Sequence, residues 1–107
     1  MINESRLEKA MFYLSSTDEK AAELRADVER SEFKAKTVKA TVFLHMTGTV
    51  AEREAEALKA NETQDAYRTH FQAIRDYNAV ANKRSLEILV VDLYRTQSAN
   101  RRQGNIT

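Results

Sequence analysis

The chain of 107 residues contains no cysteine, no proline and only two glycines. Without cysteine it can form neither disulfides nor thiolate metal sites, and it has no cysteine nucleophile. Gly48 and Gly104 lie too far apart in the sequence to build a glycine-rich phosphate loop. Because proline breaks or kinks helices, its complete absence favours a helical protein.

Long hydrophobic runs are missing as well. The longest uninterrupted apolar run covers residues 10–14, whereas a membrane-spanning helix needs about 20 apolar residues. The first 14 residues are interrupted by charged side chains and do not have the pattern of a signal peptide. We therefore expect a protein of the cytoplasm that makes no contact with membranes.

The composition is that of a folded protein, with 42% hydrophobic and 31% charged residues. The length fits one domain with a modest core. Two long stretches, residues 17–46 and 62–97, contain neither proline nor glycine and are rich in residues that favour helix. We predict a single helical domain over residues 1–97, followed by a basic, flexible C-terminal tail over residues 98–107.

Capping residues divide the chain into predicted helices. We place these helices at residues 4–14, 17–46, 50–59 and 62–97. Ser15 and Ser16 are expected to separate the first helix from the second, and Thr49 with Glu52 forms a capping box that begins the third. The predicted fold is all-α: a long antiparallel helical hairpin with a short N-terminal helix and a short helix at the hairpin tip, assembling as a homodimer.

The helix predicted over residues 17–46 carries two separate stripes of apolar and small residues. The first has coiled-coil spacing and comprises Ala21, Leu24, Val28, Ser31, Ala35, Val38, Val42 and His45. The second comprises Ala26, Phe33, Thr37, Ala40 and Leu44. A single partner helix cannot cover both faces. We therefore predict a protein-interaction surface at Phe33, Thr37, Ala40 and Leu44, together with Tyr94.

In the last predicted helix the inward-facing stripe is expected to comprise Tyr67, Phe71, Ile74, Asn78, Ala81, Ser85 and Ile88. Between residues 86 and 94 apolar side chains surround the helix on nearly every side. A helix of this kind is expected to be buried nearly all round. Any part of this surface that the chain leaves uncovered favours a dimer.

Basic residues offer an alternative to protein binding. The net charge is only +1, but Lys34, Lys36 and Lys39 form a basic stretch of the second helix, and every charge after Asp92 is positive. These positive charges are Arg95, Arg101 and Arg102. The three lysines and the three arginines together are the candidate nucleic-acid contacts. Solvated helix faces and neutralisation of neighbouring acids explain the same residues without nucleic acid.

Catalytic and metal-binding patterns are weak. His45 and His70 have no second ligand at metal-binding helical spacing. Four carboxylates have a spacing also found in the magnesium sites of all-helical nucleotide pyrophosphohydrolases: Glu29, Glu32, Glu62 and Asp65. Solvated helix faces account for them more simply, and no serine lies in a nucleophile motif. We predict no catalytic residues, no metal and no cofactor.

Two strings in the sequence carry a resemblance. The string T-G-T-V-A-E-R spans residues 47–53, and N-R-R-x-G-N-I spans residues 100–106. With them, nearly the whole chain resembles small helical proteins of unassigned function that tailed bacteriophages and prophages encode. The resemblance implies a setting among phage genes for DNA replication or recombination, in the cytoplasm of the host cell. It implies no activity and no catalytic residues.

We therefore predict a small, non-enzymatic phage protein that acts by binding another protein. The expected partner is a phage protein of DNA metabolism or a host defence or repair protein. The alternative is an accessory protein that binds nucleic acid through the basic residues of the second helix and the C-terminal tail. A metal-dependent nucleotide hydrolase is the weakest of the three hypotheses.

Overall fold

The computed structural model describes residues 1–106, which form three α-helices and no strand. Helix α1 spans Glu4–His45, α2 spans Val50–Lys59 and α3 spans Asn61–Ile106. The all-α prediction is confirmed for this part of the chain. Within it, no helix contains a stretch that is long and apolar enough to cross a membrane.

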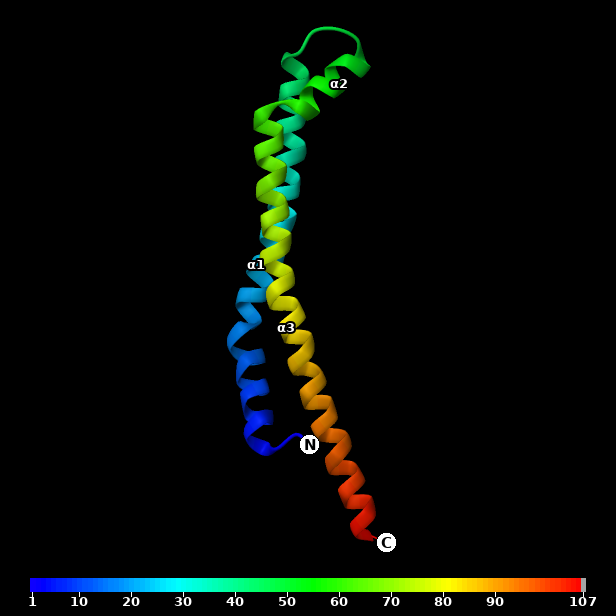
Figure 1. The fold of residues 1–107 in the computed structure, drawn as a ribbon. Helices are drawn as coiled ribbons and strands as arrows, with labels where there is room; N and C mark the ends of the chain where they lie inside the picture. Colours follow the sequence, from blue (N-terminus) through cyan, green and yellow to red (C-terminus); the bar gives the residue numbers. More distant parts are fainter. Residues whose placement is uncertain (107) are drawn as a thin grey trace. The chain divides into compact units, whose positions relative to one another are not determined.

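The helices build two compact units (Figure 1). Unit 1 contains residues 1–21 and 78–107, and unit 2 contains residues 22–77. The single domain expected over residues 1–97 stays a prediction. In unit 1 the start of α1 lies beside the second half of α3, and contacts from Arg6 to Glu87 and from Arg84 to Thr17 show that the two segments are antiparallel.

Unit 2 is a helical hairpin, because the second half of α1 and the first half of α3 are antiparallel and α2 lies between them in the sequence. At the turn, Gly48 has a φ of 117°, a value that side chains disfavour. The hydroxyl of Thr49 accepts a hydrogen bond from the backbone N–H of Glu52 at 3.2 Å, as the predicted cap requires. Arg53 donates to the carbonyl of Phe43 near the end of α1.

The predicted separate N-terminal helix is wrong, because α1 continues without interruption from Glu4 to His45. Ser15, Ser16 and Thr17 do not cap a new helix. Their hydroxyls donate to backbone carbonyls three or four residues earlier, at 3.1, 3.2 and 2.6 Å. Serine and threonine are tolerated inside a helix when they bond back to the preceding turn in this way.

At the other end, residues 98–106 are part of α3, not an irregular tail. This stretch contains no proline, and arginine and glutamine favour helix. Two contacts with the N-terminus of the chain hold this end of α3 within unit 1. The backbone N–H of Ile2 donates to Oε1 of Gln97 at 3.3 Å, and Arg101 contacts the sulfur of Met1 at 3.5 Å. Residue 107 lies outside the described residues, and flexibility of the tail stays a prediction.

The predicted inner stripe of α1 is largely confirmed in unit 2. Ala35 is completely buried, and Leu24, Val28, Ser31, Val38 and Val42 are half-buried, although His45 is exposed. We call this row the seam of α1. Because its residues are small, α3 can approach α1 closely.

The predicted inner stripe of α3 is partly wrong. Tyr67, Ile74 and Ala81 are half-buried, but Phe71, Asn78, Ser85 and Ile88 are exposed. The most buried side chains of α3 are instead Thr63, His70, Glu87 and Val90. Two of the three polar residues have partners there: His70 contacts Ser31, and Glu87 contacts Arg6. The buried hydroxyl of Thr63 has no hydrogen-bond partner among the described residues.

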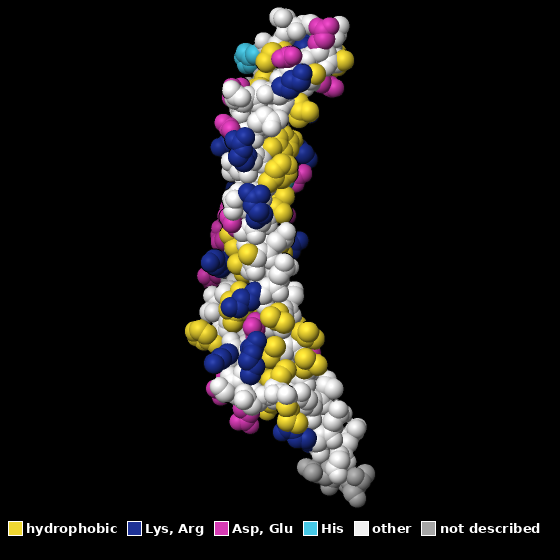
Figure 2. Space-filling model, viewed as in Figure 1, with side chains coloured by type: hydrophobic (Ala, Val, Ile, Leu, Met, Phe, Trp, Pro, Cys, Tyr) yellow, Lys and Arg dark blue, Asp and Glu magenta, His cyan; other side chains and the backbone are white. Residues whose placement is uncertain are grey.

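Large hydrophobic side chains are mostly at the surface. The fully buried residues of the described chain are small: Ala10, Ala35, Ala57 and Thr63. Exposed large side chains include Phe12, Phe33, Leu44, Leu86 and Leu89. The expectation that residues 86–94 are buried nearly all round is therefore wrong for the single chain. Figure 2 shows hydrophobic side chains interrupting the charged surface in both units.

Candidate protein-interaction surfaces

The predicted interaction surface on α1 is an exposed row of side chains in unit 2. We call Phe33, Thr37, Ala40 and Leu44 the outer stripe. Phe33 is 75% exposed and Leu44 is 72% exposed, and Thr37 and Ala40 are exposed as well. At 100° and 1.5 Å per residue, the four residues lie within about 60° of one another and cover about 16 Å of helix.

The outer stripe faces away from α3. Helical geometry places Phe33 roughly 160° around α1 from Ser31 and Ala35 of the seam. The hydroxyl of Thr37 donates to the carbonyl of Phe33, and that of Thr41 donates to the carbonyl of Thr37, both at 2.9 Å. Their hydroxyl protons are therefore already satisfied, which lowers the cost of covering these threonines with an apolar partner.

The predicted basic residues of α1 have different surroundings. Lys36 pairs with Glu32 at 3.0 Å, and this hydrogen bond raises the pKa of Lys36 and lowers the pKa of Glu32. Lys39 is half-buried, whereas Lys34 is exposed. Of the three lysines in the predicted basic stretch, one is thus paired with a carboxylate and another is half-buried.

Tyr94 and the C-terminal arginines belong to unit 1. Tyr94 is half-buried, and Arg95, Arg101 and Arg102 are exposed on α3. A role of Tyr94 in the interaction surface stays a prediction. Arg101 is in contact with Met1. At 100° per residue these three arginines spread over roughly 120° of the helix, which is broad for contact with a single phosphate backbone.

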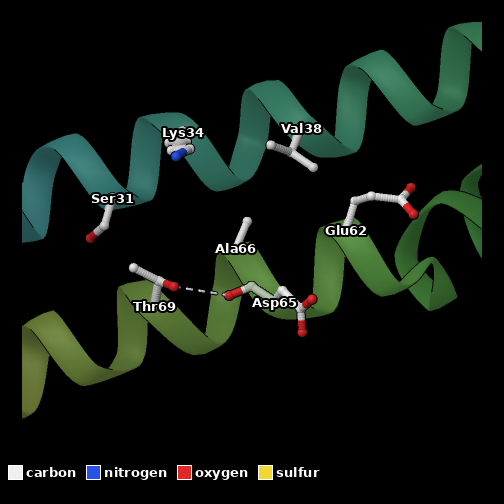
Figure 3. A pocket seen from close by; sticks show the side chains of 7 residues that line it. All are labelled: Ser31, Lys34, Val38, Glu62, Asp65, Ala66 and Thr69. Carbon is white, nitrogen blue, oxygen red and sulfur yellow. Dashed lines mark hydrogen bonds between the residues drawn. The ribbon is translucent and has the colours of Figure 1, made fainter.

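A shallow cavity of about 250 Å³ lies between α1 and α3 in unit 2 (Figure 3). Lys34 and Val38 line it from α1, and Glu62, Asp65 and Ala66 line it from α3. Its charged rim contains one lysine and two carboxylates. Lys34 therefore lies in mixed surroundings, which weakens its role in a basic patch.

Ser31 and His70 form a pair that the sequence did not predict. Ser31 Oγ lies 2.9 Å from His70 Nδ1 and 3.0 Å from the carbonyl of Val28. If Nδ1 of His70 carries the proton, it donates to the hydroxyl of Ser31, and that hydroxyl donates to the carbonyl of Val28. If Nδ1 is unprotonated, the hydroxyl of Ser31 donates to Nδ1 instead. Backbone N–H groups around Ser31 are used by the helix, so they cannot stabilise an oxyanion. The pair fits a polar contact that fixes helix register better than a catalytic one.

Metal-binding arrangements are not found among the described residues, where no group of three or more histidines and carboxylates could hold an ion. His45 Nδ1 lies 2.8 Å from the carbonyl of Thr41. Glu32 pairs with Lys36, and Asp65 pairs with Arg68 at 2.7 Å. Both carboxylates thus have basic partners on their own helices.

Unit 1 contains a charged contact that joins the start of α1 to the second half of α3. Arg6 holds Glu87 with two hydrogen bonds, from Nη1 to Oε2 at 2.7 Å and from Nη2 to Oε1 at 2.9 Å. These bonds lower the pKa of the nearly buried Glu87. Sequence reasoning missed the pair because each residue alone looks like part of a solvated helix face.

Arg84 makes a second contact of this kind. Its Nη1 donates to the carbonyl of Leu14 at 2.7 Å and to the hydroxyl of Thr17 at 2.8 Å, and its Nη2 donates to Asp18 at 3.2 Å. Polar contacts therefore supply much of the specificity with which α1 and α3 meet in unit 1.

Comparison with models of protein families, with curated proteins and with solved structures found no match to this chain. The resemblance to phage-encoded helical proteins therefore stays a prediction that rests on the residues alone.

Proposed function

We propose that this protein is a non-enzymatic interaction module that binds a partner protein through the outer stripe of α1. The observation that carries the proposal is the exposure of Phe33 and Leu44 on the face of α1 opposite the seam. Exposed apolar side chains in helical register are the usual anchor for an amphipathic helix that lies across them.

The charge around the outer stripe specifies the partner further. Residues 33–51 contain three lysines and no acidic residue. Lys36 is paired with Glu32 and Lys34 lies near two carboxylates, so the positive charge is partly neutralised within the chain. We propose that the partner is an amphipathic helix whose acidic flanks complement the remaining positive charge. Following the resemblance, we place this helix in a phage protein of DNA metabolism or in a host defence or repair protein, in the cytoplasm of the host cell.

Two synthetic helical peptides test the proposal. Both carry the same leucine face, and one has glutamate flanks whereas the other has lysine flanks. We expect the glutamate peptide to bind in fluorescence anisotropy and the lysine peptide to bind more weakly. Binding should be lost in the double variant Phe33→Asp, Leu44→Asp.

Phe71→Asp is the matched control, because Phe71 is an exposed phenylalanine of α3 in the same unit. It should bind the glutamate peptide as the unaltered chain does. Equal loss of binding in Phe71→Asp, or binding that survives the double variant, would remove the outer stripe as the site. A tagged chain and the double variant can then be compared for the proteins that each recovers from lysate.

Nucleic-acid binding is the second candidate. The observation in its favour is the exposure of Lys34, Arg95, Arg101 and Arg102. The pairing of Lys36 with Glu32 and the carboxylates beside Lys34 count against it. We rank it below protein binding for that reason.

A further inference from the structure

We propose that a second copy of this chain packs against a leucine-centred row on α3 in unit 1. The row repeats with alternating spacings of three and four residues, the spacing of a coiled-coil seam. We call it the leucine stripe, and its members are Ala79, Asn82, Leu86, Leu89, Leu93, Thr96 and Asn100. It extends over about 32 Å of helix.

Every member of the leucine stripe is exposed in the single chain. Leu86 is 54% exposed, Leu89 is 52% exposed and Leu93 is 45% exposed. The side of α3 that meets α1 carries Glu87, which Arg6 binds, and lies roughly 100–160° around the helix from the three leucines. Within unit 1 the start of α1 therefore leaves the leucine stripe uncovered.

The absence of charge from the stripe points to a second copy as its occupant. Charged residues make up 31% of the chain, yet none of the seven stripe positions is charged. A two-fold symmetric interface brings the same surface of both subunits together. A charged residue in such an interface would bring like charges from the two copies close together. Because the leucine stripe carries no charge, two copies can pack against each other without repulsion.

The polar members of the stripe suit this role. Leucines occupy its centre, and Asn82 and Asn100 lie near its ends. In coiled coils an asparagine at a core position lowers affinity and fixes the register and the number of strands. We infer that two copies bury their leucines against each other, with the asparagines limiting how far the helices can slide.

Sedimentation equilibrium tests this interface. The unaltered chain should have twice its monomer mass of 12.2 kDa at high micromolar concentration. Leu89→Glu should have the monomer mass. Phe12→Glu is the matched control, because Phe12 is an exposed aromatic residue of unit 1 outside the stripe, and it should remain a dimer.

A monomeric unaltered chain would overturn the proposal, as would a dimeric Leu89→Glu variant or equal dissociation by Phe12→Glu. Should Leu89→Glu lose its helical circular dichroism, the variant Asn82→Leu decides the matter. Two added leucines at the interface should lower the dimer dissociation constant by about tenfold or more, and an unchanged or higher constant would refute the stripe. The outer stripe is not altered by any of these variants, so its peptide binding is tested separately.

Discussion

Replacing Ala35 with leucine tests the seam on which unit 2 depends. Ala35 is completely buried in the middle of the seam. Figure 3 shows the side chain of Ala66 on α3 pointing toward α1. Leucine adds three carbon atoms at a position that has no exposed surface. Overpacking of a tightly packed interior costs about 1–3 kcal/mol.

The expected change in melting temperature follows from the size of the chain. Unfolding entropy is about 2.1 cal/mol/K per residue, which gives about 0.2 kcal/mol/K for 107 residues. A cost of 1–3 kcal/mol should therefore lower the melting temperature by about 4–13 °C. Thermal unfolding followed by circular dichroism at one fixed protein concentration measures this shift, since association would make it concentration-dependent.

The matched control is Ala22→Leu, because Ala22 is an exposed position of α1 in the same unit. Surface substitutions usually change stability by less than about 0.5 kcal/mol, so this variant should melt within about 2 °C of the unaltered chain. If Ala35→Leu melts at the same temperature as Ala22→Leu, the seam is not tightly packed and its small residues do not set the distance between the helices.

Two further predictions concern charged residues. The lowered pKa of Glu87 stabilises the fold above the pKa of about 4.3 that glutamate has when unfolded, and this contribution is lost as the pH falls through the folded value. The unaltered chain should thus have a higher melting temperature than Glu87→Gln at pH 7, and the difference should become smaller toward pH 3. A difference in melting temperature that stays constant with pH would contradict the pairing with Arg6. If the C-terminal arginines bind DNA, replacing Arg101 and Arg102 with alanine should reduce the slope of log affinity against log salt by about 0.9 per lost phosphate contact. Undetectable binding at low salt would exclude that function.

Features set by neighbouring residues could be predicted from the sequence. Thr49 caps α2 because its hydroxyl needs only the N–H of Glu52, three residues later. The seam around Ala35 and the outer stripe around Phe33 followed from helical periodicity, because both lie within one uninterrupted helix. Exposure of the outer stripe also followed, since one neighbouring helix covers only one face of α1.

Features that depend on a distant partner could not be predicted. The helix boundary expected at Ser15 and Ser16 was wrong for a local reason, because the same hydroxyls can cap a helix or bond back to the preceding turn. The buried side of α3 was predicted to include Phe71 and Ile88, the more apolar choices. His70 and Glu87 lie inside instead.

His70 and Glu87 are buried where a partner is present, and these partners are far away in the sequence: Ser31 is 39 residues from His70, and Arg6 is 81 residues from Glu87. The sequence by itself thus determined that the chain is helical, where α2 begins and which faces of α1 are apolar, because these depend on propensity and spacing within a few turns. Only the tertiary structure decided which face of α3 is buried and where its leucines are left exposed, because that depends on which side chains meet across the two helices.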